Sequence, residues 1–235
     1  MSTDKPRIGF VGLGLMGHGM AKNLVAKGFP LTVRLHKNRK PAEDILAAGA
    51  KEVKTYAELA RASDIVILCV TGSPQIEEIV YGETDILSAA REGLVVVDTS
   101  TAEPSSTAKD PRRSGARREP RYVDAPLART PKEAEEGRLN TMVGADEATF
   151  AQLKPVLSAY CENVVHVGGP GHGHMVKLVN NFIAMSIATA TAEACAACAK
   201  AGVSIRKLHE VVSAGGSQLR NLSDDGRQDA RERRS

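Results

Sequence analysis

Short apolar runs alternate with segments of helical spacing along most of this chain. The first run, residues 8–11, predicts a buried strand, and helical spacing follows over 16–26. Further strands are predicted at 31–35, 65–70, 94–97, 122–125, 142–143 and 164–167. Helices are predicted at 42–48, 58–62, 76–80 and 147–160. Strands that alternate with helices predict an α/β fold with a doubly wound parallel sheet of the Rossmann type.

A glycine-rich turn follows the first predicted strand. It reads Gly12-Leu13-Gly14-Leu15-Met16-Gly17, a G-x-G-x-x-G between a strand and a helix. In this context the first glycine permits the tight turn, the second lets the backbone approach a pyrophosphate, and the third lets the helix pack on the strand. The helix N-terminus offers free N–H groups to the phosphates. We therefore expect these six residues to bind a dinucleotide.

The end of the second predicted strand indicates which nicotinamide cofactor is bound. NAD-selective folds place an Asp or Glu about 20 residues beyond the glycines. Here the chain reads Arg34-Leu35-His36-Lys37-Asn38-Arg39-Lys40, and no acid appears before Glu43. Cations at this place pair with a 2′-phosphate. The sequence favours NADP over NAD, with Lys37 and Arg39 as contacts and His36 beside them; the alternative is a solvated basic loop.

Composition narrows the class of protein. The chain has 235 residues, 42% hydrophobic and 25% charged, which is typical of a soluble globular protein. Aromatic residues make up 3%, and the net charge of +3 is local, so we expect no nucleic-acid partner. No signal peptide is recognised, and we expect no apolar run long enough to span a membrane. The nearest candidate, 175–199, is interrupted by Lys177, Asn180, Asn181 and Glu193. We expect a cytoplasmic protein without a membrane partner.

The cysteines indicate neither a redox site nor a metal site. The chain has four of them, a number that fits the reducing cytosol. Cys195-x-x-Cys198 lies inside an alanine-rich run of helical spacing rather than at a helix start after a strand. We expect this pair to pack as small side chains, and we expect no metal.

Several stretches, together with the glycine turn, resemble the β-hydroxyacid dehydrogenases. They are Asp98-Thr99-Ser100-Thr101, Val123-Asp124-Ala125-Pro126-Leu127-Ala128-Arg129-Thr130, Gly137-Arg138-Leu139-Asn140-Thr141-Met142-Val143-Gly144 and Gly171-His172-Gly173-His174-Met175-Val176-Lys177-Leu178-Val179-Asn180-Asn181. That family includes 3-hydroxyisobutyrate dehydrogenase, tartronate semialdehyde reductase and the glyoxylate/succinic semialdehyde reductases. The resemblance implies hydride transfer between a nicotinamide cofactor and a small anionic semialdehyde or its hydroxy acid.

The resemblance also implies roles for single residues. Lys177 matches the family's catalytic lysine, and Asn181, one helical turn later, matches a substrate-binding asparagine. Thr101, Val70-Thr71 and Gln75 match cofactor contacts. A lysine partly withdrawn from water has a lowered pKa and can act as a general acid. Without the resemblance, the alternative is that Lys177 is an ordinary solvated surface lysine near a helix start. Imine reductases share the architecture but usually replace this lysine.

The substrate loop departs from the family pattern. Where the family usually has Ser-Gly-Gly, this chain has Ala128-Arg129-Thr130. Arg129 would offer a two-pronged contact to an anion; the alternative is a surface arginine beside Pro131. A similar Gly-Arg-Thr occurs in the sulfolactaldehyde reductase branch of the family, so the acid of the substrate stays open between carboxylate and sulfonate.

The expected domains are a dinucleotide-binding domain at 1–168, the start of an all-α domain with a long helix at 169–219, and a disordered tail at 220–235. The chain is shorter than members of the family, so the alternative function is a catalytically incompetent cofactor-binding protein.

The stretch 109–120 carries two prolines and a glycine where a crossover helix is needed. Local frame errors, here and after Gln218, would explain both odd stretches; a genuine basic loop is the alternative. The resemblance implies a homodimer or homotetramer.

Overall fold

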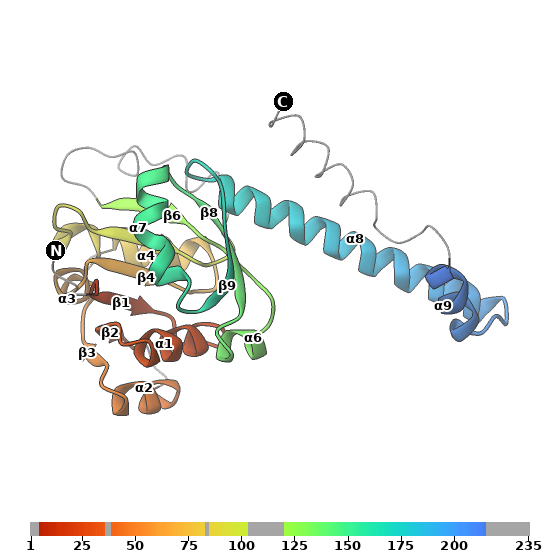
Figure 1. Cartoon of the computed structure of the whole chain (residues 1–235), viewed down its shortest axis with the longest axis horizontal. Helices are drawn as coiled ribbons and strands as arrows, with labels where there is room; N and C mark the ends of the chain where they lie inside the picture. Colours follow the sequence, from red (N-terminus) through yellow and green to blue (C-terminus); the bar gives the residue numbers. More distant parts are fainter. Residues whose placement is uncertain (1–4, 36–38, 83–84, 103–119, 215–235) are drawn as a thin grey trace. The chain divides into compact units, whose positions relative to one another are not determined.

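The structure is a computed structural model, and it describes residues 5–35, 39–82, 85–102 and 120–214. In these ranges nine strands form one sheet in the order β3-β2-β1-β4-β5-β6-β8-β7, with β9 paired to β8 (Figure 1). The strands are β1 (Ile8–Val11), β2 (Leu31–Arg34), β3 (Lys51–Val53), β4 (Ile65–Leu68), β5 (Val95–Asp98), β6 (Arg121–Asp124), β7 (Leu127–Ala128), β8 (Leu139–Gly144) and β9 (Cys161–Gly168). The predicted stretch 109–120, except Pro120, and the tail 220–235 lie outside the described residues.

Strands β1 to β6 are all parallel, and Ile8 of β1 lies level with Leu31 of β2 and Ile65 of β4. Their order is that of a dinucleotide-binding fold, in which the ligand lies where the strand order reverses, between β1 and β4. Strand β8 runs antiparallel to β6 and β7 and parallel to β9. The predicted α/β doubly wound sheet is confirmed, with an antiparallel extension at one edge.

Helices cover both faces of the sheet because its central strands are apolar on both sides. Phe10 of β1 packs in one core with residues of the helices α1 and α7, whereas Val11 packs in the other core with α3 and α4. The α-helices are α1 (Gly17–Ala26), α2 (Glu43–Ala47), α3 (Tyr56–Ala62), α4 (Ser73–Tyr81), α6 (Pro131–Glu135), α7 (Glu147–Leu157), α8 (His172–Lys200) and α9 (Ile205–Ala214). Figure 1 shows α6 beside α1, which it contacts.

Three short elements were not predicted from the hydrophobic pattern. Strand β3 is an exposed edge strand, β7 is only two residues long, and α6 is a helix of five residues. Helix α6 nevertheless has a sequence signal, because Thr130 and Glu133 form a capping box around its first turn. The same motif, Thr55 with Glu58, begins α3 at Tyr56, two residues before the predicted start.

The chain divides into two compact units, Met1–Val179 and Asn180–Ser235. The sheet lies in the first unit, and the described part of the second consists of the rest of α8 and of α9. By length and composition α8 could cross a membrane, with a mean hydropathy of 1.5 in its most apolar window. This corrects the expectation that no run is long enough, because the interrupting polar residues are too few. Core helices of soluble proteins pass the same test.

Candidate active site

A cavity of about 1060 Å³ lies at the carboxyl ends of β1, β2 and β4, where a Rossmann-type sheet binds its ligand. Its walls come from the glycine turn, the end of β2, the loop after β4, and the helices α3, α4 and α6. The predicted cofactor residues in its lining are Gly12, Leu13, Gly14, Leu15, Val70, Thr71 and Gln75. Met16, Gly17 and Thr101 are not among the lining residues.

The three glycines of the turn are required for different reasons. Gly12 has φ +99°, and an ideal Cβ there would lie 2.1 Å from the carbonyl oxygen of Cys69. A Cβ on Gly17 would lie 1.9 Å from the carbonyl oxygen of Gly12. The fold itself therefore needs these two glycines. A Cβ on Gly14 would have nothing within 4 Å, so this position leaves open space in the cavity wall where a pyrophosphate can approach the backbone.

The loop after β4 is held by the two residues that follow β5. The backbone N–H of Val70 donates to Ser100 Oγ at 3.0 Å, and Thr99 Oγ1 donates to the carbonyl oxygen of Leu68 at 2.7 Å. These contacts fix the backbone of Val70 and Thr71 at the cavity wall. Thr101, the predicted contact in this segment, is exposed.

Arg34 is a site residue that the sequence analysis missed. It ends β2 and lines the cavity, and its guanidinium carbon lies 4.4 Å from the centre of the Tyr56 ring. Its Nε is buried and has no hydrogen-bond partner among the described residues. A buried N–H without an acceptor costs free energy. An oxygen of a bound anion would satisfy it, so this corner of the cavity fits a phosphate.

The basic loop after β2, which was predicted to bind the cofactor, contributes no described cation to the cavity lining. Arg39 donates two hydrogen bonds to the carboxylate of Glu52, at 2.7 and 2.6 Å. Its guanidinium is therefore engaged with β3 and does not line the cavity. His36 and Lys37, the other predicted contacts, lie outside the described residues.

A charged cluster, formed by His18, Lys22, Asp44 and Glu135, lies at another side of the cavity. His18 Nδ1 is 2.5 Å from Glu135 Oε1, and its Nε2 is 3.1 Å from both oxygens of Asp44. Lys22 Nζ donates to Glu135 Oε2 at 2.9 Å. Burial opposes charge on His18, but the two carboxylates outweigh it and raise its pKa. The cluster joins α1, α2 and α6, and the hydrophobic pattern gave no sign of it.

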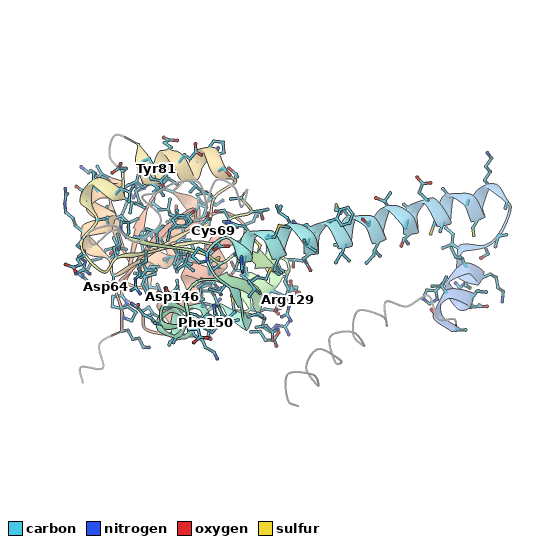
Figure 2. All side chains as sticks on the ribbon, turned by 90° about the horizontal axis from the view of Figure 1, so that it is seen from above. Asp64, Cys69, Tyr81, Arg129, Asp146 and Phe150 are labelled. Atoms are coloured by element: carbon cyan, nitrogen blue, oxygen red, sulfur yellow. The ribbon has the colours of Figure 1, made fainter. Side chains whose placement is uncertain are left out.

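Arg129, which is labelled in Figure 2, lies in the predicted substrate loop and has an unusual backbone conformation. Its φ is +85°, in the left-handed region that favours glycine, and no other non-glycine residue in the described ranges has a positive φ. Its guanidinium donates to the carboxylate of Glu162 and to the carbonyl oxygen of Arg138. Ala128 lies in β7 and Thr130 caps α6. None of these three loop residues lines the cavity.

Lys177 lies near the start of α8 and is half-buried, and burial lowers the pKa of its ammonium group. It is not among the residues that line the cavity. Asn181 follows one helical turn later along α8, in the second unit, and is also half-buried. Burial thus shifts the pKa of Lys177 in the direction that makes its ammonium group a better proton donor.

The strand order, the glycine turn and the cavity define a Rossmann-type dinucleotide-binding protein. Residues 7–168 match the family model of the NAD-binding domain of 6-phosphogluconate dehydrogenase. Residues 171–235 match that of the NAD-binding domain of NADP-dependent 3-hydroxyisobutyrate dehydrogenase. The chain belongs to the β-hydroxyacid dehydrogenase family, and by class it is an NAD(P)-dependent 3-hydroxyacid dehydrogenase.

Named relatives support this class. The chain is 34% identical over 220 residues to 2-hydroxy-3-oxopropionate reductase of Escherichia coli K12, a match that covers 94% of this chain and 74% of the relative. It is 36% identical over 206 residues to 2-(hydroxymethyl)glutarate dehydrogenase of Eubacterium barkeri, covering 88% and 68%. The solved 3-hydroxyisobutyrate dehydrogenase of Mycobacterium tuberculosis superimposes with a TM-score of 0.83 at 27% identity, covering 92% and 72%. The chain is shorter than these relatives.

Proposed function

We propose that this protein is an NADP-dependent reductase that interconverts a small anionic semialdehyde and its hydroxy acid, with Lys177 as the general acid and base. The relatives from Escherichia coli and Eubacterium barkeri are a reductase of an oxo acid and a dehydrogenase of a hydroxymethyl acid, which supports this substrate class. The half-buried ammonium group of Lys177 supports the acid–base role.

The unpaired buried Nε of Arg34 carries the choice of NADP. In this fold the end of the second strand faces the ribose of the adenosine, where NAD-selective proteins place a carboxylate. Here that end places a guanidinium in the cavity wall, stacked on Tyr56. A 2′-phosphate would supply the missing acceptor and the opposite charge. Lys37 and Arg39 are proposed as additional contacts, and Arg39 would first have to leave Glu52.

The remaining cofactor contacts are proposed from the cavity lining and from the family resemblance. The glycine turn, Gly12 to Gly17, would hold the pyrophosphate at the start of α1, and Val70, Thr71 and Gln75 would line the path toward the nicotinamide. Thr101 does not line the cavity and is proposed from the resemblance alone. A bound nicotinamide supplies the hydride for reduction of the aldehyde carbon. Lys177 Nζ would donate a proton to the carbonyl oxygen as negative charge develops on it. Arg129 would bind the anionic end of the substrate through its planar fork. Asn181 is proposed as a further substrate contact from the family resemblance.

The exposed apolar side chains of α8 and α9 support the expected homodimer or homotetramer. Phe182, Met185 and Val211 are 72%, 64% and 70% exposed. Large exposed apolar surfaces mark association sites or aggregation risks. Analytical ultracentrifugation over a range of concentrations tests this: a monomer at every concentration would contradict it.

Titration of the purified protein with NADPH and with NADH tests the cofactor. The matched variants are Arg34→Met, which keeps an apolar stem over Tyr56, and Arg61→Met, which removes an exposed arginine from α3. We expect tighter binding of NADPH than of NADH. Arg34→Met should weaken NADPH binding by about 10- to 100-fold, which corresponds to the loss of one hydrogen bond to a charged group. The affinity for NADH should change by no more than about twofold. Equal weakening of both cofactors, or tighter NADH binding by the unmodified protein, would overturn the assignment.

A further inference from the structure

Asp124, the last residue of β6, hydrogen-bonds to the start of α8. Its side chain is fully buried. Oδ1 accepts from the backbone N–H of Gly171 at 2.7 Å, and Oδ2 accepts from the backbone N–H of His174 at 2.8 Å. Helix α8 begins at His172, so the two donors are the residue before the helix and its third residue.

This arrangement replaces an ordinary helix cap. The first N–H groups of a helix have no acceptor within the helix. They usually bond to a Ser, Thr, Asp or Asn side chain just before the helix. That position is Gly171 here, which has no side chain, and the carboxylate comes instead from the sheet, 47 residues earlier in the chain. Its negative charge also complements the positive end of the helix dipole.

Close packing leaves no room for a side chain between the helix start and the sheet. A Cβ on Gly173 would lie 2.5 Å from the carbonyl oxygen of Met142 and 2.7 Å from that of Asp124. A Cβ on Gly144 would lie 2.4 Å from Asp124 Oδ1. The first turn of α8 is therefore pressed against the ends of β6 and β8.

The buried imidazole of His174 adds a contact to a third strand. Its Nε2 is 3.7 Å from Oδ2 of Asp98, the last residue of β5, and both side chains are fully buried. Tyr122 of β6 donates to the same oxygen of Asp98 at 2.6 Å. The start of α8 is thus fixed against three strand ends.

Lys177 lies on the same helix face as this anchor. It follows Gly173 by four residues and His174 by three, the spacings at which helix side chains are neighbours. Gly173, His174 and Lys177 are buried or half-buried, whereas Met175 and Val176 between them are exposed. Lys177 therefore lies within one helical turn of the residues that Asp124 holds against the sheet.

We propose that Asp124 is a positioning residue for Lys177: it caps α8 from the sheet and so fixes the place and the partial burial of the ammonium group. The inference rests on the proposed role of Lys177 in proton transfer. Misplacing a reacting group by about 1 Å can cost about 10²-fold in rate. A change at Asp124 should therefore act on turnover more than on binding of the cofactor.

The variant Asp124→Asn tests this with little change in shape. Its amide oxygen can accept one of the two N–H groups, and its NH₂ faces the other donor. Asp146→Asn is the matched control, because Asp146 caps α7 in the same unit by accepting from Thr149 N–H at 2.9 Å (Figure 2). We expect Asp124→Asn to lower kcat by about 10- to 100-fold with NADPH binding within about twofold. Asp146→Asn should lower the melting temperature and leave kcat unchanged.

A second readout does not depend on turnover. NMR titration of labelled lysine side chains, with the signal assigned by Lys177→Arg, measures the pKa of Lys177 in the cofactor-free protein. We expect a lowered pKa in the unmodified protein and in Asp146→Asn, and a return toward the ordinary lysine value in Asp124→Asn. Gly173→Ala, which keeps the carboxylate but forces the helix start outward, should lower kcat and raise this pKa, as Asp124→Asn does.

The outcomes separate the two proposals. An unmodified protein without turnover would contradict the proposed function, and the lysine titration would still decide the role of Asp124. An unchanged pKa of Lys177 in both Asp124→Asn and Gly173→Ala would overturn the positioning role. Equal losses of kcat in Asp124→Asn and Asp146→Asn would also overturn it, because they would show only a general loss of stability.

Discussion

Arg39 of the loop after β2 and Glu52 of β3 form a two-pronged ion pair, with N–O distances of 2.7 and 2.6 Å. Both ends are partly exposed, so the pair contributes little to stability. In the proposed NADP site, Glu52 would compete with the 2′-phosphate for the guanidinium donors of Arg39.

Glu52→Gln should therefore tighten NADPH binding by about 3- to 10-fold at low salt, because it frees the guanidinium for a charge-assisted contact. NADH binding should not change. Glu92→Gln removes one exposed carboxylate before β5 and is the control for net charge. Isothermal titration calorimetry with each cofactor measures these affinities. Equal tightening of NADPH and NADH binding would contradict a role for Arg39 at the 2′-phosphate.

Two glycines of the turn should respond differently to alanine. Gly14→Ala should leave the melting temperature unchanged, because a Cβ there meets nothing within 4 Å. It should weaken binding of either cofactor by at least about tenfold, since the methyl group takes the space of the pyrophosphate. Gly17→Ala should lower the melting temperature sharply, because its Cβ would lie 1.9 Å from the carbonyl oxygen of Gly12. Thermal unfolding with and without NADPH measures both effects.

His18 should make stability depend on pH. Its pKa in the folded protein is raised, so its ion pairs stabilise the fold fully below its ordinary pKa of about 6.5. This stabilisation is lost as the pH rises through the raised value. The melting-temperature difference between the unmodified protein and His18→Gln should thus be largest near pH 6 and shrink above neutrality. The exposed His209 of α9 provides the control, His209→Gln. A difference that grows with pH would be incompatible with the cluster.

Glu162 should compete with the substrate for Arg129, because the carboxylate of Glu162 contacts the guanidinium. Glu162→Gln should lower KM for an anionic aldehyde by about 2- to 5-fold, with kcat unchanged, and Arg129→Lys should raise KM, because lysine lacks the planar fork. Steady-state kinetics measure both. If neither variant changes KM, Arg129 does not bind the anion.

The central fold was predictable because its strands are buried on both faces. Continuous apolar runs such as Ile65–Leu68 of β4 are typical of central parallel strands, and their alternation with helical spacing favours that interpretation. Strand β3 was missed because two of its three residues, Lys51 and Glu52, are exposed at the sheet edge, where no apolar pattern is needed. Helix α6 was missed because five residues are too few for periodicity, although its capping box was readable.

The site was predictable only where a local motif specifies the backbone. The glycine turn is such a motif, and most of its residues line the cavity. Arg34 was missed because its exposure to the cavity depends on Tyr56, 22 positions away in the sequence. Two further contacts join separate elements, and no local pattern encodes them: Arg39 pairs with Glu52, and His18 pairs with Glu135. Whether Lys177 and Asn181 act in catalysis stays a prediction.

The most direct measurement is NADPH oxidation with glyoxylate, succinic semialdehyde and tartronate semialdehyde, by the unmodified protein, by Lys177→Met and by Lys154→Met. Lys154 is an exposed lysine of α7 and serves as the control. We expect turnover of at least one aldehyde by the unmodified protein and by Lys154→Met. Lys177→Met should lose about 10²- to 10⁴-fold in kcat, the usual contribution of a general acid, and bind NADPH within about twofold. NADPH binding without turnover by the unmodified protein, or full activity of Lys177→Met, would contradict the account.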